Sequence, residues 1–98
     1  MRRAAKIDVN QPEIVEAFRR MGFSVLPLHT VGHGCPDILI GKLGKNHLVE
    51  IKDGKKPPSA RKLTQDEQKF HERWRGSIFV VESIEAAMQL NVHLNPES

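Results

Sequence analysis

Two short apolar runs joined by a turn of glycine and lysine constrain the fold of this chain more than any other feature. The runs are Pro36–Gly41 and Asn46–Lys52. Short aliphatic runs separated by a few residues that include glycine predict an antiparallel β-hairpin. A loop closed at Lys42–Lys45 pairs Gly41 with Asn46, and this pair sets the register of the whole hairpin.

Three charged residues lie where a buried strand would stay apolar: Asp37, Glu50 and Lys52. The register places Asp37 directly opposite Glu50. Paired residues share a face of the sheet with their side chains about 5 Å apart, which is close enough for two carboxylates to bind one divalent cation. Strand alternation puts Lys52 on the same face as Glu50, whereas Val49 and Ile51 point into a core.

This arrangement favours a hard divalent cation. Two carboxylates held together repel each other unless one is protonated or a cation lies between them, and oxygen ligands suit Mg²⁺ or Mn²⁺. The backbone carbonyl of Ile51 can add a neutral oxygen, and Lys52 beside the metal can orient or help deprotonate a water and offset charge on a phosphate. The alternative is a hairpin whose charged face simply meets solvent. The other potential ligands lack the paired spacing of a zinc site: His29, His33, Cys35 and His47.

The pattern of Pro-Asp, a short gap and Glu-x-Lys resembles the PD-(D/E)xK nuclease superfamily. The longer run Glu50–Phe70, EIKDGKKPPSARKLTQDEQKF, is similar to the stand-alone VRR-Nuc domains of phages and bacteria, and the resemblance covers residues 10–81. It implies a metal-dependent endodeoxyribonuclease that uses Mg²⁺, with Mn²⁺ as a substitute. It also implies catalytic roles for Asp37, Glu50 and Lys52.

A first helix is predicted to begin after Asn10 as its N-cap and to stop at Gly22. Its apolar stripe at helical spacing consists of Ile14, Ala17, Phe18 and Met21. Glu13 lies at the edge of this stripe, so its side chain is expected to reach inward. The resemblance implies an additional acidic residue of the catalytic and metal site in this helix, and the match falls on Glu13. An acid favoured by the helix dipole is the alternative.

A second helix is predicted from the capping box of Thr64 and Glu67 through about Arg75. Periodicity does not single out a functional residue in it. The resemblance implies a catalytic-site glutamine, and the match falls on Gln68. A glutamine at this place can accept a hydrogen bond from Lys52 and donate one to a phosphate or water. An ordinary glutamine on the helix surface is the alternative.

The remaining elements complete an α/β pattern. Strands are predicted at Ser24–His29 and Ile78–Val81, and Ser83 is predicted to cap a final helix. The apolar residues expected to face the core from the last two helices are Phe70, Trp74, Ile84, Ala87 and Met88. The order helix, strand, strand, strand, helix, strand, helix predicts an α/β domain with a small mixed β-sheet flanked by helices, as the resemblance also implies.

A single domain is expected from a chain of 98 residues. Residues 1–9 are interpreted as a flexible basic arm, residues 10–91 as the nuclease domain and residues 92–98 as a C-terminal tail. The one cysteine excludes an intramolecular disulfide and is typical of a reducing compartment. No apolar run approaches the roughly 20 residues of a membrane span, so a cytoplasmic protein without membrane contact is expected.

A basic loop follows the hairpin. Between Lys52 and Lys62 there are five Lys or Arg residues against one Asp, which favours a polyanionic partner such as DNA. Lysine-rich loops that serve solubility alone are the alternative. The residues expected to contact DNA are Lys55, Lys56, Ser59, Arg61 and Lys62, with His33 beside the active site. For Arg2, Arg3 and Lys6 in the arm a frayed terminus is expected, and contact with phosphates is the alternative.

The expected function is Mg²⁺-dependent hydrolysis of phosphodiester bonds in DNA, without a small-molecule cofactor. The resemblance implies a homodimer that cuts branched DNA such as four-way (Holliday) junctions, and a two-fold axis suits paired incisions. Two other classes stay open. One is a non-catalytic nucleic-acid-binding module, and the other is a nuclease that acts on RNA or on single-stranded DNA ends.

Overall fold

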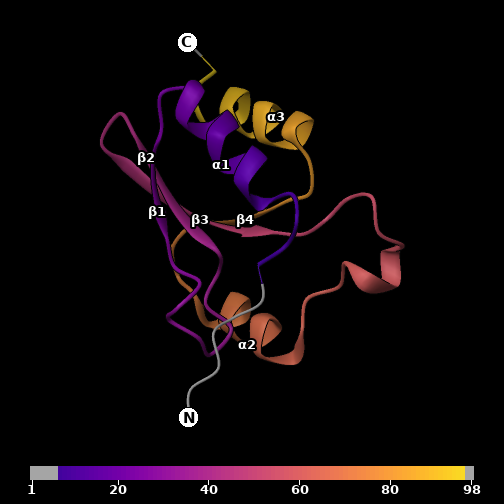
Figure 1. Ribbon diagram of the computed structural model, residues 1–98. Helices are drawn as coiled ribbons and strands as arrows, with labels where there is room; N and C mark the ends of the chain where they lie inside the picture. The colour runs from indigo at the N-terminus through magenta and orange to yellow at the C-terminus, as the bar shows by residue number, and fades with distance from the viewer. Residues whose placement is uncertain (1–6, 97–98) are drawn as a thin grey trace.

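A computed structural model describes residues 7–96 (Figure 1). The predicted arm residues Arg2, Arg3 and Lys6 lie outside the described residues. The elements are α1 (Gln11–Arg20), β1 (Ser24–Pro27), β2 (Ile38–Lys42), β3 (Lys45–Ile51), a short 3₁₀ turn (Pro58–Ala60), α2 (Gln65–Arg73), β4 (Ile78–Val81) and α3 (Ile84–Leu94). The predicted α/β fold is confirmed. The predicted end of the domain at residue 91 is wrong, because α3 continues to Leu94.

The four strands form one mixed sheet in the order β1-β2-β3-β4. The first three strands are antiparallel, and β4 lies parallel to β3. Gly41 pairs with Asn46, so the predicted hairpin register is confirmed. The turn consists of Leu43 and Gly44, which have φ angles of 54° and 78°. Two successive residues with positive φ are typical of a tight hairpin turn whose twist matches that of the strands.

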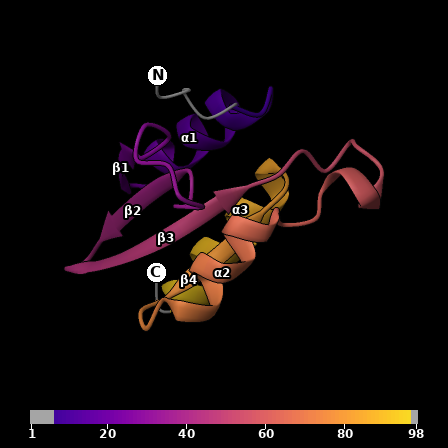
Figure 2. The same cartoon turned by 90° about the horizontal axis from the view of Figure 1, so that it is seen from below.

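The hydrophobic core lies between the sheet and the α1–α3 pair. These two helices lie side by side over one face of the sheet, and α2 lies on the opposite side (Figures 1 and 2). The core side chains come from α1, the inward face of β2 and β3, β4 and α3, and include Ile14, Phe18, Ile40, Val49, Ile51 and Ala87. The face of β3 that turns away from this core is therefore turned toward α2.

Three of the apolar residues predicted to face the core from the last two helices do not. Trp74 is 46% exposed and stacks on the ring of Phe70, with ring centroids 5.4 Å apart. None of the residues of α2 is buried. In α3, Ala87 is buried as predicted, but Ile84 and Met88 are exposed on a groove between α1 and α3. The reason is that α3 turns Ala87 and Leu90 toward the sheet, so the other side of its stripe remains outside.

Polar side chains hold the ends of the helices. Thr64 forms the predicted capping box with Glu67, and the Ser83 hydroxyl accepts from the N–H of Ala86. Asn10 stands at the N-cap of α1, but its side chain does not cap the helix. Its Nδ2 atom donates to the backbone carbonyls of Lys52 and Glu82, at 3.1 and 3.3 Å. Asn10 thus fastens the start of α1 to the ends of β3 and β4. No helix within residues 7–96 is long and apolar enough to cross a membrane.

Candidate active site

A pocket of about 460 Å³ lies where three segments meet: the end of β3, the loop before β2 and the start of α2. We call it the carboxylate pocket, because Asp37, Glu50 and Glu67 line it together with Lys52. The first turn of α2 approaches the loop closely at Gly34. That glycine has a φ of 78°, and a Cβ atom there would lie 2.2 Å from the carbonyl oxygen of Asp66. Only glycine allows this approach.

Asp37 is held against the end of β3. Its Oδ2 atom accepts from the backbone N–H of Ile51 at 2.7 Å, and its own carbonyl accepts from the N–H of Leu28 at 2.8 Å. The strand register continues from the pair Ile38 and Val49, so Asp37 falls opposite Glu50 as the sequence predicts. The hairpin therefore brings the two carboxyl groups together at the pocket.

Glu50 is a buried acid without a full set of partners. Its side chain is 2% exposed, and its Oε1 atom has no hydrogen-bond partner among the described residues. Burial raises the pKa of Glu50 to about 10, and contact with Asp37 acts in the same direction. At neutral pH the carboxyl is accordingly protonated unless a cation replaces the proton.

These donors suit a hard divalent cation. An unpartnered buried oxygen and a neighbouring carboxylate are ligands that Mg²⁺ or Mn²⁺ accepts. Among residues 7–96, no group of three or more His, Cys, Asp and Glu side chains is arranged to hold a metal ion. A cation would therefore rest on Asp37 and Glu50 and complete its shell with backbone oxygen and water. The predicted Ile51 carbonyl is such a backbone oxygen, from the last residue of β3.

Lys52 is present at the pocket as a cation. Its Nζ atom donates to Glu67 Oε1 at 2.7 Å. Burial by itself lowers the pKa of Lys52, but the bond to Glu67 and the charges of Glu67, Glu50 and Asp8 raise the pKa above its ordinary value. For Glu67 burial raises the pKa, and the bonds from Lys52 and the Thr64 N–H outweigh burial and lower it. Both side chains are therefore charged and paired.

Gln68 does not contact Lys52. It is exposed on α2, and its Nε2 atom donates to Glu72 at 3.4 Å. The preceding residue, Glu67, takes the place that the sequence analysis gave to Gln68. The helix turns its Glu67 side toward the sheet, so Gln68 points outward, and the prediction that Gln68 steadies Lys52 is wrong.

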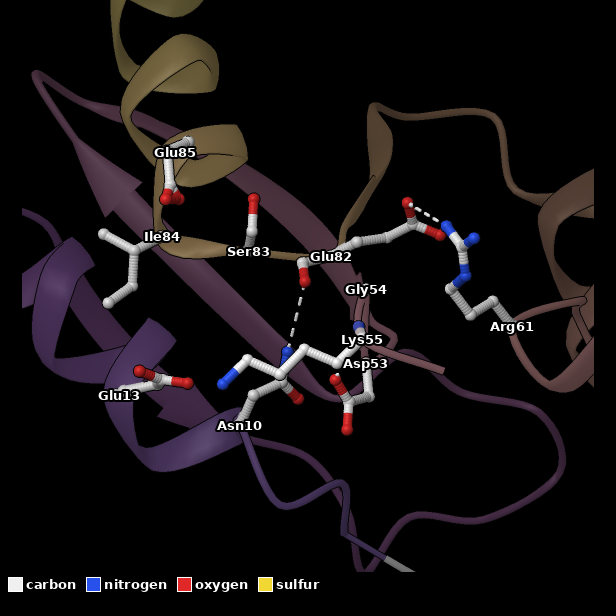
Figure 3. A pocket seen from close by; sticks show the side chains of 10 residues that line it. All are labelled: Asn10, Glu13, Asp53, Gly54, Lys55, Arg61, Glu82, Ser83, Ile84 and Glu85. Atoms are coloured by element: carbon white, nitrogen blue, oxygen red, sulfur yellow. Dashed lines mark hydrogen bonds and ion pairs between the residues drawn. The ribbon is translucent and has the colours of Figure 1, made fainter. Parts of the chain in front are cut away.

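Glu13 is likewise not at the carboxylate pocket. It is exposed on α1 and lines a second pocket of about 480 Å³ (Figure 3). We call this second cavity the loop pocket, because Asp53, Lys55 and Arg61 of the basic loop also line it. The expectation that Glu13 reaches inward is wrong, because α1 packs on the face of the sheet opposite to α2.

Two polar residues close to the predicted site residues were not predicted from the sequence: Asp8 and His71. Asp8 lines the pocket, and its Oδ1 atom lies 3.7 Å from the Nζ atom of Lys56. His71 of α2 has its Nε2 atom 3.6 Å from Glu50 Oε1, and burial lowers the pKa of His71. His71 follows Glu67 by one helical turn, so the capping box could have pointed to it once Glu67 was placed inward.

The four potential zinc ligands, whose spacing already disfavoured a zinc site, do not all lie together. His29, His33 and Cys35 line the carboxylate pocket. His47 instead lies at Ser77, with Nδ1 and Oγ 2.6 Å apart. His33 thus stands beside the site as predicted, with a positive φ of 57°.

The basic residues of the loop differ in how their charges are balanced. Arg61 contacts Glu82 at 3.2 Å (Figure 3), and Lys56 faces Asp8. Lys55 and Lys62 are exposed and form no ion pair with any described residue. Ser59 is exposed in the 3₁₀ turn. Within this loop, the positive charge that no carboxylate balances therefore lies on Lys55 and Lys62.

Comparison of the chain with protein-family models, with curated proteins and with solved structures found no significant match. The function is therefore inferred from the geometry and the electrostatics of the pocket.

Proposed function

We propose that this chain is a Mg²⁺-dependent endonuclease that hydrolyses phosphodiester bonds in DNA. One observation carries the proposal. The Glu50 carboxyl is buried beside Asp37 with an unpartnered oxygen, and the cationic Lys52 lines the same pocket. A pair of acids with one unpartnered buried oxygen, and a lysine in the same pocket, are suited to bind a divalent cation and a phosphate at adjacent positions.

The burial of Glu50 argues against a hairpin whose charged face merely meets solvent. An ordinary surface glutamate keeps its hydration, whereas Glu50 is 2% exposed. Burying a carboxyl without satisfying it costs free energy. Strongly perturbed acids in a cleft are enriched at functional sites, which supports the assignment of chemistry to this pocket.

Each of these residues has its own role in the proposed hydrolysis. Asp37 and Glu50 would hold the cation, which when bound polarises the phosphodiester and lowers the pKa of a water. Asp37 is kept in place by the Ile51 N–H. Lys52 is protonated, so it offsets the negative charge that grows on the phosphoryl oxygens and does not remove a proton from water.

The DNA path is proposed to follow the basic loop. Figure 1 shows the segment between β3 and α2 extending away from the rest of the domain. Its exposed Lys55 and Lys62 suit contacts with phosphates, which position a nucleic acid without reading bases. Branched DNA as substrate and a homodimer as the active form remain part of the proposal, on the strength of the sequence resemblance.

The test uses a labelled four-way junction and a linear duplex of matched sequence, each with Mg²⁺ or Mn²⁺. Asp37→Asn keeps an oxygen that can accept from the Ile51 N–H but removes the charge. We expect cleavage by the wild type, none by Asp37→Asn, and full cleavage by Glu13→Gln. Junction binding without cleavage under either metal would instead favour the non-catalytic module. Cleavage of RNA or single-stranded ends alone would change the substrate class.

A further inference from the structure

The capping box of α2 and the Lys52 ammonium share one oxygen atom. Glu67 Oε1 accepts from Lys52 Nζ at 2.7 Å and from the backbone N–H of Thr64 at 2.8 Å. In return, the N–H of Glu67 donates to the Thr64 hydroxyl at 3.2 Å. The same carboxylate therefore begins a helix and binds the lysine of the pocket.

The Lys52–Glu67 pair is shielded from solvent. The side chains are 12% and 18% exposed, respectively. An exposed ion pair on a protein surface does little to restrict the positions of its side chains. A shielded pair restricts both side chains, and removal of one leaves the other without a counter-charge. A lysine has four rotatable bonds, so its ammonium has no defined position unless a partner supplies one.

The position of Glu67 is itself determined by the rest of the pocket. Its backbone lies in the first turn of α2, which the loop at Gly34 contacts so closely that a Cβ atom there would lie 2.8 Å from the Glu67 nitrogen. The loop at Gly34 therefore fixes the first turn of α2, and the Glu67 carboxylate in that turn fixes Lys52.

We propose that Glu67 is a positioning residue for phosphodiester hydrolysis, which acts by holding the Lys52 ammonium beside the Asp37–Glu50 pair. This role rests on the proposed function. A capping box accepts glutamine as well as glutamate at this position of the helix. The cap alone therefore does not require a carboxylate, whereas a salt bridge to Lys52 does.

Two variants separate the cap from the lysine contact. Glu67→Gln keeps a side chain that can complete the capping box, but it removes the negative charge that pairs with Lys52. We expect kcat for DNA cleavage, measured well below the unfolding temperature, to fall at least about tenfold, with KM changed less than about twofold. Thr64→Ala removes the hydroxyl cap and leaves the Glu67 carboxylate and the Thr64 N–H. We expect a lower Tm and nearly unchanged kcat at a temperature well below unfolding.

A double-mutant cycle tests whether Glu67 acts through Lys52. In the Lys52→Ala background, Glu67→Gln should produce little further loss, because the group that Glu67 positions is gone. Additive losses in kcat would overturn the positioning role and assign Glu67 an independent one.

A measurement that does not depend on DNA cleavage tests the contact between Glu67 and Lys52 separately from the proposed function. The labelling rate of Lys52 by acetic anhydride, followed by mass spectrometry, should rise in Glu67→Gln and stay unchanged in Thr64→Ala. Unchanged labelling in Glu67→Gln would overturn the ion pair. Wild-type cleavage with an equal kcat in Glu67→Gln would overturn only the role of Glu67. Absence of wild-type cleavage would overturn the proposed function, and this role with it.

Discussion

Two pockets of similar size differ in how the charges that line them are balanced. The carboxylate pocket has about 460 Å³ and the loop pocket about 480 Å³. In the carboxylate pocket Glu50 is 2% exposed and one of its oxygens has no partner. In the loop pocket Glu13 and Glu85 are exposed, and Glu82 is paired with Arg61.

The pockets differ in whether a buried acid has its partners, and this difference is why we propose chemistry at the carboxylate pocket and not at the loop pocket. An exposed carboxylate keeps its water, and a paired one has its counter-charge, so neither requires a ligand. Asn10 lines the loop pocket, and its amide donates to the carbonyl of Glu82 (Figure 3) and to that of Lys52, a residue whose side chain lines the carboxylate pocket.

The largest expected effect comes from exchanging one acid in each pocket for its amide. Glu50→Gln should reduce the rate of DNA cleavage by at least about 10²-fold, because it removes a charge that the cation needs. Glu13→Gln should stay within about twofold of the wild type, since it changes only hydrated surface. Cleavage rates at saturating Mg²⁺ give the comparison. A larger loss for Glu13→Gln would reverse our assignment of the two pockets.

The next effect concerns the close contact that builds the carboxylate pocket. Gly34→Ala should lower the free energy of unfolding by about 1–3 kcal/mol and also slow cleavage, because the new methyl group displaces the first turn of α2. Gly44→Ala is the matched control: both glycines have a φ of 78°, but nothing lies within 4 Å of a Cβ atom at Gly44. The free energies of unfolding of both variants, measured in urea, separate the cost of the close contact at Gly34 from the cost of the strained backbone that both positions share. Equal losses would mean that the contact contributes nothing.

A smaller effect is expected from pH on the metal-free protein. The pKa of Glu50 is raised in the folded state from its ordinary 4.5 to about 10, so the folded protein binds this proton more tightly than the unfolded chain does. The corresponding stability is complete below pH 4.5 and is lost as pH rises toward 10. Between about pH 7 and 8.5, this linkage lowers the free energy of unfolding by about 2 kcal/mol, so Tm should fall by roughly 10 °C, and Mg²⁺ should oppose the fall.

Glu50→Gln is the control for this pH dependence, because it stays neutral throughout. The pH window also avoids the histidines: burial lowers the pKa values of His47 and His71, so their contribution changes below pH 6.5. A slope of Tm that persists unchanged in Glu50→Gln would assign the titration to another group.

The hairpin and its carboxyl pair were predictable because their causes are local. Strand alternation and a two-residue turn at Leu43 and Gly44 set the register, so Asp37 falls opposite Glu50 without reference to the rest of the fold. The caps at Thr64 and Ser83 were predictable for the same reason. Each of these features depends on a few neighbouring residues.

The helix residues of the site depend on contacts that are distant in sequence, and there the predictions failed. Glu67 rather than Gln68 faces Lys52 because the Gly34 loop sets how the first turn of α2 lies on the sheet. Glu13 lies outside the carboxylate pocket because α1 packs with α3 on the other face. Helical periodicity identifies an apolar stripe, but it does not say which pocket the residues at the edge of the stripe will line.

The smallest expected effect distinguishes balanced from unbalanced charges on the basic loop. Lys62→Ala should weaken DNA binding a few-fold and lower the magnitude of the salt slope by about one, as the loss of one phosphate contact does. Arg61→Ala should change the slope less, because Glu82 already balances its charge at 3.2 Å. Binding titrations with a four-way junction, over a range of NaCl and with Ca²⁺ in place of Mg²⁺, measure both slopes. If Arg61→Ala has the larger effect, DNA must displace Glu82 from Arg61, and the loop pocket would then belong to the DNA-binding surface.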